Sequence, residues 1–206
     1  MKKEELNIEG LYKIQKKDLK RCAQVAAGAF LDDESSKFLF SSKLTYRALY
    51  DYYLLIYKAA YGKMHMFADC KNIDGFIIIA PIKSSELSLW DCIKTGGLKA
   101  LLSLGTRVII KSLEYENHCI KIRSKFASPE SWYVFQFGVA PTKQGQGLGS
   151  RTMKPFLNWI DSKKIACYLE TNKACNVDMY NHFGFSLKEE TTLPKKNVSQ
   201  FAMLRS

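Results

Sequence analysis

The sequence predicts a mixed α/β (α+β) fold, and two observations lead to that class. Helical periodicity dominates the front of the chain, whereas short apolar runs typical of strands dominate the back. The chain has 206 residues, 47% of them hydrophobic, which suffices for a substantial core. No internal repeat, low-complexity segment or linker divides the sequence, so we expect one domain over residues 1–206.

Two helices are expected near the front of the chain. Apolar residues recur at helical spacing over residues 18–30, and Asp18 is placed to act as the N-cap. A polar connection follows over residues 31–37. A second helix, rich in tyrosine and leucine, should cover residues 45–61.

A hairpin and a long helical segment come next. Residues 64–69 and 75–80 have the composition of strands, and residues 71–74 between them have that of a turn. From about residue 86 to residue 125 the pattern is helical again, with breaks at Gly96, Gly97 and Gly105. Residues 1–130 should therefore form N-terminal helices, a hairpin and a helical insertion.

The back of the chain centres on a glycine cluster, Gln144-Gly145-Gln146-Gly147-Leu148-Gly149. A strand over Trp132–Val139 leads into the cluster, and a helix with an apolar face leaves it. Pro155 lies inside this helix, where a kink or an irregular start is expected because proline removes a backbone donor.

The remaining elements are shorter. A strand over Cys167–Thr171 should precede a short helix that Asn176 opens and that ends near Phe183. Closing strands are expected from Gly184 onward, the last of them over residues 200–204.

Composition limits the classes of partner. The net charge of +11 favours an anionic partner, such as nucleic acid, a membrane surface or a phosphorylated cofactor. Because the lysines are spread along the chain and no nucleic-acid signature is present, we expect no nucleic-acid partner. The apolar runs are too short to span a bilayer, so we expect no membrane partner either.

Cysteine and histidine usage suggests a reduced environment without metal. The six cysteines show no CxxC pairing, and the first ten residues lack the apolar run of a signal peptide. These features predict a soluble, cytoplasmic protein. The three histidines, His65, His118 and His182, have no metal-ligand spacing, so no metal is expected.

Two common phosphate-binding motifs do not fit the glycine cluster. A P-loop needs a Gly-Lys pair, and none follows Gly145. A dinucleotide fingerprint, GxGxxG, starts well at Gly145 and Gly147, and Glu170 is a suitable acidic residue downstream. However, the third glycine, Gly149, comes one position early, and too little chain follows to complete a doubly wound sheet.

The cluster instead resembles the GNAT superfamily of acetyl-CoA-dependent N-acetyltransferases. That family's signature, Q/R-x-x-G-x-G/A between a strand and a helix, is matched by residues 144–149, and the preceding Val139-Ala140-Pro141 is also typical. A second block agrees downstream, with Asn176, Tyr180 and the closing Gly184-Phe185. The resemblance covers residues 132–205.

The resemblance implies a GNAT-like domain with a mixed, mostly antiparallel sheet whose central strands splay apart and are flanked by helices. The splayed strands are Trp132–Val139 and Cys167–Thr171, and the pantetheine arm of coenzyme A would lie between them. Acetyl-CoA would contact the strand end, the glycine cluster and the short helix, through Phe137, Gly138, Val139, Gln144, Gly145, Gln146, Gly147, Leu148, Gly149, Ser150, Asn176 and Tyr180.

The glycine cluster also has a physical reason to hold a diphosphate. The first N–H groups of a helix have no intrahelical partner and lie at the positive end of its dipole, so they bind anions. Lys143 and Arg151 flank the cluster and could add charge-assisted bonds, or serve only as solvated surface residues.

The resemblance implies acyl transfer to an amine. The Phe137 N–H would bond the thioester carbonyl, and Tyr180 would act as general acid toward the departing thiolate. The base is less clear, because the strand Trp132–Val139 contains no carboxylate and has Tyr133 near the place where some relatives carry glutamate. Candidates are Glu170 and a water held by Gln136. Purely structural roles stay open for three of these residues: Asn176 could be an N-cap, Tyr180 a core aromatic residue and Glu170 a strand-end residue.

Two functions follow from this resemblance. The first is an N-acetyltransferase that moves an acetyl group from acetyl-CoA to a primary amine of a small molecule or peptide. The alternative is a non-catalytic sensor or interaction module that binds acetyl-CoA or CoA. Asp32, Asp33 and Glu34 could attract a cationic amine, or could simply form a solvated acidic helix start. A homodimer is possible, since dimers are common among similar enzymes.

Overall fold

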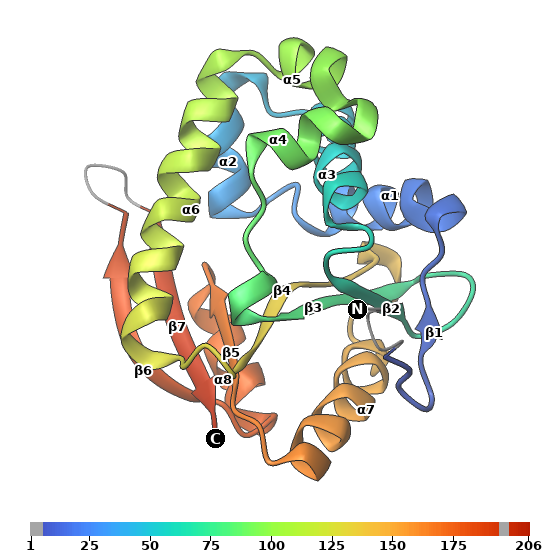
Figure 1. Ribbon diagram of the computed structural model, residues 1–206, viewed down its shortest axis with the longest axis vertical. Helices are drawn as coiled ribbons and strands as arrows, with labels where there is room; N and C mark the ends of the chain where they lie inside the picture. Colours follow the sequence, from blue (N-terminus) through green and yellow to red (C-terminus); the bar gives the residue numbers. More distant parts are fainter. Residues whose placement is uncertain (1–5, 194–197) are drawn as a thin grey trace.

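The computed structural model describes residues 6–193 and 198–206, apart from the side chains of Lys99, Ala100 and Ser103. Within these residues one seven-stranded sheet has the order β1-β2-β3-β4-β5-β7-β6. Every neighbouring pair is antiparallel except β4 and β5, which run parallel. The predicted mixed, mostly antiparallel sheet flanked by helices is therefore confirmed (Figure 1).

The N-terminal elements include both predicted helices. Their bounds are β1 Tyr12–Lys13, η1 Lys16–Asp18, α1 Leu19–Ala29, α2 Glu34–Phe40, η2 Ser41–Lys43 and α3 Tyr46–Ala60. Thr45 caps α3, because its side-chain oxygen accepts the N–H of Ala48 at 3.1 Å. Asp18 occupies the cap position of α1 without capping it; its Oδ2 accepts the Gln15 N–H and the Tyr12 hydroxyl instead.

The polar connection expected over residues 31–37 is partly wrong, because α2 begins inside it. Asp33 is the N-cap of α2, and its Oδ1 accepts both the N–H of Ser35 at 3.0 Å and its hydroxyl at 2.6 Å. Asp33 is buried, whereas its neighbours Asp32 and Glu34 are exposed. The acidic run therefore contains one inward carboxylate and two solvated ones.

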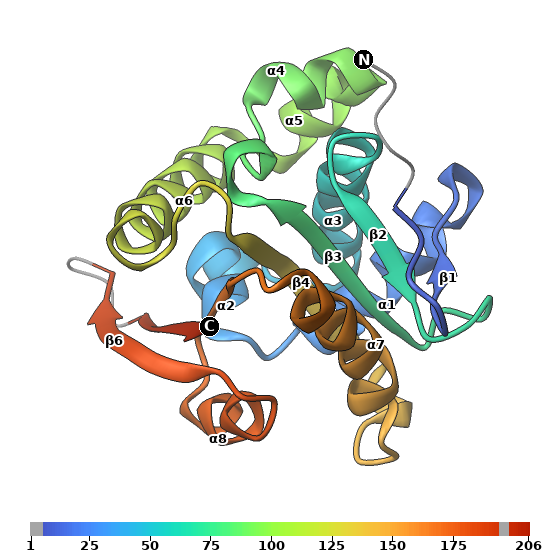
Figure 2. The same ribbon diagram turned by 60° about the horizontal axis from the view of Figure 1, so that its bottom comes forward.

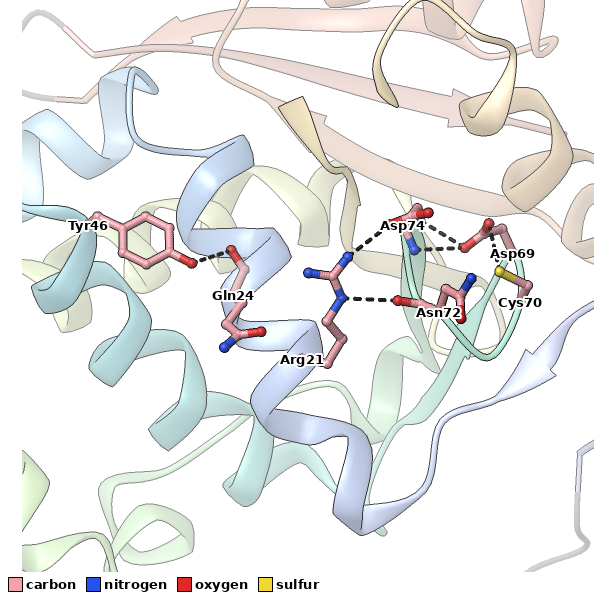
Figure 3. A network of polar contacts seen from close by, with 8 residues as sticks. Arg21, Gln24, Tyr46, Asp69, Cys70, Asn72 and Asp74 are labelled. Carbon is pink, nitrogen blue, oxygen red and sulfur yellow. Dashed lines mark hydrogen bonds and ion pairs between the residues drawn. The ribbon is translucent and has the colours of Figure 1, made fainter. Parts of the chain in front are cut away.

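The predicted hairpin is present as β2 His65–Ala68 and β3 Gly75–Pro81, and its turn is tied to α1. Asp69 Oδ1 accepts the N–H groups of Asp74 and Gly75 across the turn. Arg21 on α1 donates to the Asn72 carbonyl at 3.0 Å and to Asp74 Oδ1 at 2.8 Å (Figure 3). The Asp74 carbonyl in turn accepts the N–H of Ala140, so α1 and the hairpin together fix the exit of β4.

The helical insertion between β3 and β4 has the predicted breaks. It contains η3 Ile82–Ser84, α4 Leu89–Cys92, the π-helical turn η4 Ile93–Gly97, α5 Leu98–Leu104 and α6 Thr106–Phe126. Gly96 and Gly105 both have positive φ at the boundaries between these helices. The shorter helices form the top of the molecule in Figure 1, and α6 descends from them toward β6 and β7.

The back of the chain follows the predicted order. It contains β4 Trp132–Val139, η5 Pro141–Lys143, α7 Leu148–Lys163, β5 Cys167–Thr171, α8 Ala174–His182, β6 Ser186–Thr192 and β7 Ser199–Arg205. The bounds of β4 and β5 agree with the prediction. Asn176 does not open α8, which begins two residues earlier at Ala174. α7 continues as one helix through Pro155.

Two hydrophobic cores lie on the two faces of the sheet. On β3, Ile78 points into a core with α1 and α3, whereas Ile77 and Ile79 point into a core with α7 and α8. Figure 2 shows α3 and α7 on opposite sides of β3. A smaller cluster packs α6 over β4, β5 and β7 through Ile122, Tyr133, Tyr168 and Ala202.

Candidate active site

The strands β4 and β5 separate soon after they meet. Their pairing consists of Trp132 with Cys167 and Tyr133 with Tyr168, and the rest of β4 pairs only with β3. The predicted splay of the central strands is therefore confirmed. Beyond Tyr133 the edge of β4 that faces β5 has backbone groups without a strand partner.

A β-bulge decides which amides of β4 face the gap. Ile78 pairs with Gln136 and Ile79 with Val134, so Phe135 is an extra residue on β4. Before the bulge, the Trp132 N–H points toward β5, where it donates to the Ala166 carbonyl.

Because of the extra residue, the N–H groups of β4 that would otherwise face β3 face the gap after the bulge, and the reverse. The Ala140 N–H points toward β3, where it donates to Asp74. Because N–H direction alternates along a strand, Gly138 points its N–H the same way, and Phe137 and Val139 point theirs into the gap. The resemblance named Phe137, Gly138 and Val139 as contact residues, and of these Gly138 points its N–H toward β3 and away from the gap.

The glycine cluster forms an open loop at the start of α7. Gly145 and Gly147 have φ values of 74° and 76°, and a Cβ built at either position would meet no atom within 4 Å. Gly147 is the N-cap of α7, and the Arg151 N–H makes the first bond, to the Gly147 carbonyl. Among the described residues, the N–H groups from Gly145 to Ser150 have no recorded partner.

Side chains brace this loop without filling it. Gln144 donates to the Val139 carbonyl at 3.2 Å, and Gln146 donates to the Thr142 carbonyl at 3.1 Å. Leu148 is buried beneath the loop and Ser150 is half-buried. The loop therefore presents backbone amides on a fixed frame, which is the arrangement that an anion requires.

Two predicted glycines have a packing reason as well. A Cβ on Gly138 would lie 2.8 Å from Cε1 of Phe76, so the aromatic ring occupies the space of a side chain. A Cβ on Gly149 would lie 3.4 Å from Cζ of Phe137, which places α7 directly against the end of β4.

A cavity of about 280 Å³ joins the gap to the helical insertion. It brings together four predicted residues from three elements: Phe137 on β4, Glu170 on β5, and Asn176 and Tyr180 on α8. Asn176 lies in the first turn of α8, where its Nδ2 donates to Thr171 Oγ1 at 3.0 Å.

Tyr180 is buried against Phe185, with ring centroids 5.9 Å apart. Burial raises the pKa of the Tyr180 hydroxyl, and nearby Asp33 raises it further. The hydroxyl therefore stays protonated at neutral pH and is available as a donor.

The predicted loop residues lie beside a second hollow, of about 640 Å³. Gln146, Leu148 and Ser150 line it together with three cations and two carboxylates, namely Lys143, Arg151, Lys154, Asp69 and Asp74. The 280 Å³ cavity and this hollow share no lining residue, and Phe137, which lines the cavity, packs against Gly149 at the start of α7.

Glu170 is a buried carboxylate with a shifted pKa. Its side chain is 5% exposed, and Arg123 Nη1 lies 3.6 Å from its Oε1, which is an ion-pair distance but too long for a hydrogen bond. Burial raises the pKa of Glu170 to about 7, while the Arg123 charge acts in the opposite direction. A carboxyl group with this pKa can exchange a proton near neutral pH.

Sequence reasoning missed the charges around Glu170. Arg123 is 3% exposed at its side chain, donates to Glu116 Oε1 at 3.3 Å and lies over the Tyr133 ring at 4.3 Å from the centroid. Glu116 and Arg123 are two turns apart on the same face of α6. That spacing was the available signal, but it does not reveal which strand the face covers.

Other predicted side chains divide between cavity and core. Gln136 lines the cavity, where the Tyr57 hydroxyl donates to its Oε1 at 2.7 Å. Asp33 also lines the cavity, whereas Asp32 and Glu34 do not. Among the described residues, no group of three or more His, Cys, Asp or Glu side chains is placed to hold a metal ion.

The comparisons with known proteins agree with this geometry. Residues 112–185 match the model of the acetyltransferase (GNAT) family, so the match begins within α6, earlier than the resemblance at 132–205. An uncharacterized N-acetyltransferase of Schizosaccharomyces pombe is 33% identical over 67 residues. That alignment spans 32% of this chain and 27% of the relative's length.

Solved structures share the fold over nearly the whole chain. A protein of Corynebacterium glutamicum titled histone acetyltransferase HPA2 and related acetyltransferase has a TM-score of 0.63 at 14% identity, covering 97% of this chain and 96% of that one. A mosquito arylalkylamine N-acetyltransferase-like protein has a TM-score of 0.53 at 11% identity, covering 95% and 98%. These likenesses extend the fold across the insertion and the N-terminal helices. They show that this chain has the fold of these structures, and its segment 112–185 is similar to the GNAT acetyltransferase family.

Proposed function

We propose that this protein is an N-acetyltransferase that moves an acetyl group from acetyl-CoA to a primary amine of a small molecule or peptide. One observation carries the proposal. The N–H groups of Phe137 and Val139, which have no recorded partner among the described residues, face the gap between β4 and β5. The loop from Gly145 to Ser150, whose N–H groups also have no recorded partner there, begins α7, which packs against Phe137 at the end of β4.

The residues present fit acetyl-CoA. Two left-handed glycines with open surroundings leave room for a diphosphate at the start of a 16-residue helix. Lys143 and Arg151 are exposed beside this loop and add positive charge. The strand edge from Phe137 to Val139 would bond the amides of an extended pantetheine arm as a further strand would.

When bound, acetyl-CoA supplies an acetyl thioester and a thiolate leaving group. The amine nitrogen must first lose a proton, and Glu170 is placed at the cavity to take it. The C–N bond then forms as the C–S bond breaks. The Phe137 N–H would donate to the carbonyl oxygen as negative charge develops there, and the Tyr180 hydroxyl would donate its proton to sulfur. The second proton that the nitrogen loses on becoming an amide would return to the Tyr180 oxygen.

The names of some structural neighbours support an amine acceptor. One neighbour is titled agmatine N-acetyltransferase, and another is the mosquito arylalkylamine protein already described. Both names specify amines of small molecules. On this basis we favour an amine acceptor, while its class is argued separately from the cavity.

A non-catalytic module that binds acetyl-CoA is the second candidate. It is favoured by one observation, namely that β4 carries no carboxylate and has Tyr133 in its second position. The presence of both Glu170 and Tyr180 at the cavity argues for catalysis instead.

Calorimetry and a thiol-release assay test the proposal. Calorimetry should register binding of acetyl-CoA and not of NAD or NADP. Thiol release from acetyl-CoA should then depend on added amine. Binding without amine-dependent release would support the non-catalytic module, and absence of binding would contradict both functions.

No helix in the described part of the chain is long and apolar enough to cross a membrane. Two further expectations, the location and the oligomeric state, stay proposals. We propose a cytoplasmic location from the reduced cysteines, which are all free among the described residues. The proposal of a homodimer rests only on the fact that dimers are common among similar enzymes.

A further inference from the structure

The helical insertion supplies much of the cavity wall. Seven of the insertion's lining residues are aliphatic, and they come from α5, α6 and the segment around α4: Leu87, Leu89, Leu101, Leu104, Val108, Ile109 and Leu113. The others are Ser88, Cys92, Ser112, Tyr115, Glu116 and Cys119. The opposite wall is rich in aromatic side chains, including Phe30, Tyr52 and Tyr53. Apolar side chains therefore make up most of these walls, with the hydroxyl groups of Ser88, Ser112 and Tyr115 among them.

The charges at the cavity are all of one sign. Asp33, Glu116 and Glu170 line it, and among the side chains that the structure describes no lysine or arginine does. This is notable in a chain with a net charge of +11. A cavity with only carboxylates favours a cationic ligand and disfavours an anionic one.

The three carboxylates are not equivalent. Arg123 lies behind the cavity and pairs with both Glu116 and Glu170, at 3.3 Å and 3.6 Å. Asp33 has no ion pair recorded among the described residues, although it is only 7% exposed. Both hydrogen bonds that it accepts go to Oδ1, from the N–H and the hydroxyl of Ser35. Its other oxygen, Oδ2, is left for a ligand.

We propose that the acceptor is a primary amine with an apolar chain or ring and without a carboxylate. Its ammonium group binds Asp33, and its apolar part occupies the cavity walled by the insertion. This substrate class rests on the proposed acetyltransferase function and narrows it.

The same walls reject the other common acceptors. The carboxylate of an amino acid would lie among three carboxylates, with no lysine or arginine among the described lining residues to pair with it. The second ammonium of a polyamine would lose its hydration at the leucine and isoleucine wall of the insertion, where the carboxylate of Glu116 is already paired with Arg123. An apolar chain has neither cost, and each buried methylene contributes favourably.

The cavity volume sets the size of the amine. At about 30 Å³ for each water-sized group, 280 Å³ hold roughly nine such groups. Some of that space receives the acetyl end of the cosubstrate. Amines of about six to eight heavy atoms should therefore fill the remainder.

A matched panel of acceptors tests the proposal. Hexylamine, 6-aminohexanoate and 1,6-diaminohexane share one chain length and differ only at the far end. We expect kcat/KM for hexylamine to exceed that of both others at least about tenfold, the loss typical when a charge is left buried and unpaired. From ethylamine to hexylamine, kcat/KM should rise about fourfold for each methylene.

The variant Asp33→Asn tests the anchor, with Asp32→Asn as the matched control. Asparagine is a good N-cap, so α2 keeps its start while the negative charge is lost. We expect KM for hexylamine to rise about tenfold in Asp33→Asn, as for a lost charged hydrogen bond. It should not change in Asp32→Asn, which removes the same charge from an exposed neighbour.

The thermal shift of the unaltered protein provides a reading that needs no variant. Hexylamine should raise Tm more than hexanoate at the same concentration. If Asp33→Asn fails to fold, this measurement still tests whether the cavity prefers a cationic ligand.

The outcomes separate this proposal from the function on which it rests. If 6-aminohexanoate or the diamine is acetylated as well as hexylamine, the substrate class is wrong and the acetyltransferase stands. If no amine releases thiol from bound acetyl-CoA, the catalytic function falls, and the substrate class falls with it. Equal Tm shifts by hexylamine and hexanoate would overturn the substrate class alone.

Discussion

Tyr180 can be tested by removing one oxygen atom. Its ring packs against Phe185, and no hydrogen bond of its hydroxyl is recorded among the described residues, so phenylalanine keeps the packing. In Tyr180→Phe we expect kcat to fall about a hundredfold, the usual contribution of a general acid. The affinity for acetyl-CoA, measured by calorimetry, should be unchanged. A kcat equal to that of the unaltered protein would remove Tyr180 from the mechanism.

Glu170 predicts the acid limb of the pH–rate profile. Because burial raises its pKa to about 7, the carboxylate form that accepts a proton is lost as pH falls below 7. We expect kcat/KM to rise with pH and to level off above an apparent pKa of about 7. In Glu170→Gln this limb should disappear together with most activity. A limb that persists in the variant would assign it to another group.

The same shift affects stability with a definite sign. The folded-state pKa of about 7 lies above the unfolded value of 4.5, so folding favours the protonated group. Its contribution is fully present below pH 4.5 and is lost as pH rises through 7. Denaturant unfolding should therefore show that Glu170→Gln becomes more stable relative to the unaltered protein between pH 4.5 and pH 8. An unchanged difference would contradict the burial of this carboxylate.

At the residue scale, the sequence predicted which side chains meet but not which charges surround them. Glu170, Asn176 and Tyr180 were recognised because a strand and a short helix follow one another within a single motif. Arg123 was missed because its contact with Glu170 joins residues that are 47 positions apart, and only the fold brings them together. Asp33 was named together with Asp32 and Glu34, and burial alone separates it from them.

At the scale of the element, the loop before α7 depends on left-handed glycines. Gly147→Ala places a methyl group in the space that the diphosphate would occupy and strains a residue with φ of 76°. We expect the Kd for acetyl-CoA to rise about tenfold and stability to fall by about 1–2 kcal/mol.

Gly62→Ala is the matched control for that substitution. Gly62 has φ of 86° and also no atom within 4 Å of a built Cβ, but it follows α3, far along the chain from the loop. It should lose similar stability and keep its affinity for acetyl-CoA. Equal losses of affinity in both variants would show that Gly147 acts through stability only.

The predicted bounds of the helices and strands were most accurate where the chain is buried or where turn residues flank the element. The bounds of β4 and β5 agree because both are short apolar runs next to turn residues. The helix α2 was missed because seven residues are too few to show a helical period, and its acidic cap resembles a loop. The bulge at Phe135 has no signal in the sequence, yet it decides which amides face the gap.

At the scale of the whole molecule, the net charge of +11 should speed the capture of an anionic cosubstrate. We expect the association rate of acetyl-CoA, followed by stopped-flow tryptophan fluorescence, to fall about tenfold between low salt and 0.5 M salt. Acetyl-pantetheine, which lacks the phosphates, is the control and should be insensitive. Equal salt dependence of both ligands would contradict steering by charge.

The fold class and the splayed sheet were predictable, because two sequence blocks at suitable spacing identify the β4-loop-α7 and β5-α8 units. The insertion was recognised as helical, but its place beside the site was not, since helical periodicity shows that a face is buried and not what it covers. The identity of the acceptor depends mainly on that placement.

In the part of the chain that the structure describes, two residue pairs join the β1–β4 half of the sheet to the β5–β7 half. A pantetheine arm bound in the gap would supply hydrogen bonds between β4 and β5 where the two strands do not pair. The cosubstrate would then connect the two strands as well as react, and the protein should be most rigid while the cosubstrate is bound. Release of the product would remove that connection, so the turnover rate would depend on how readily the short pairing between β4 and β5 rearranges.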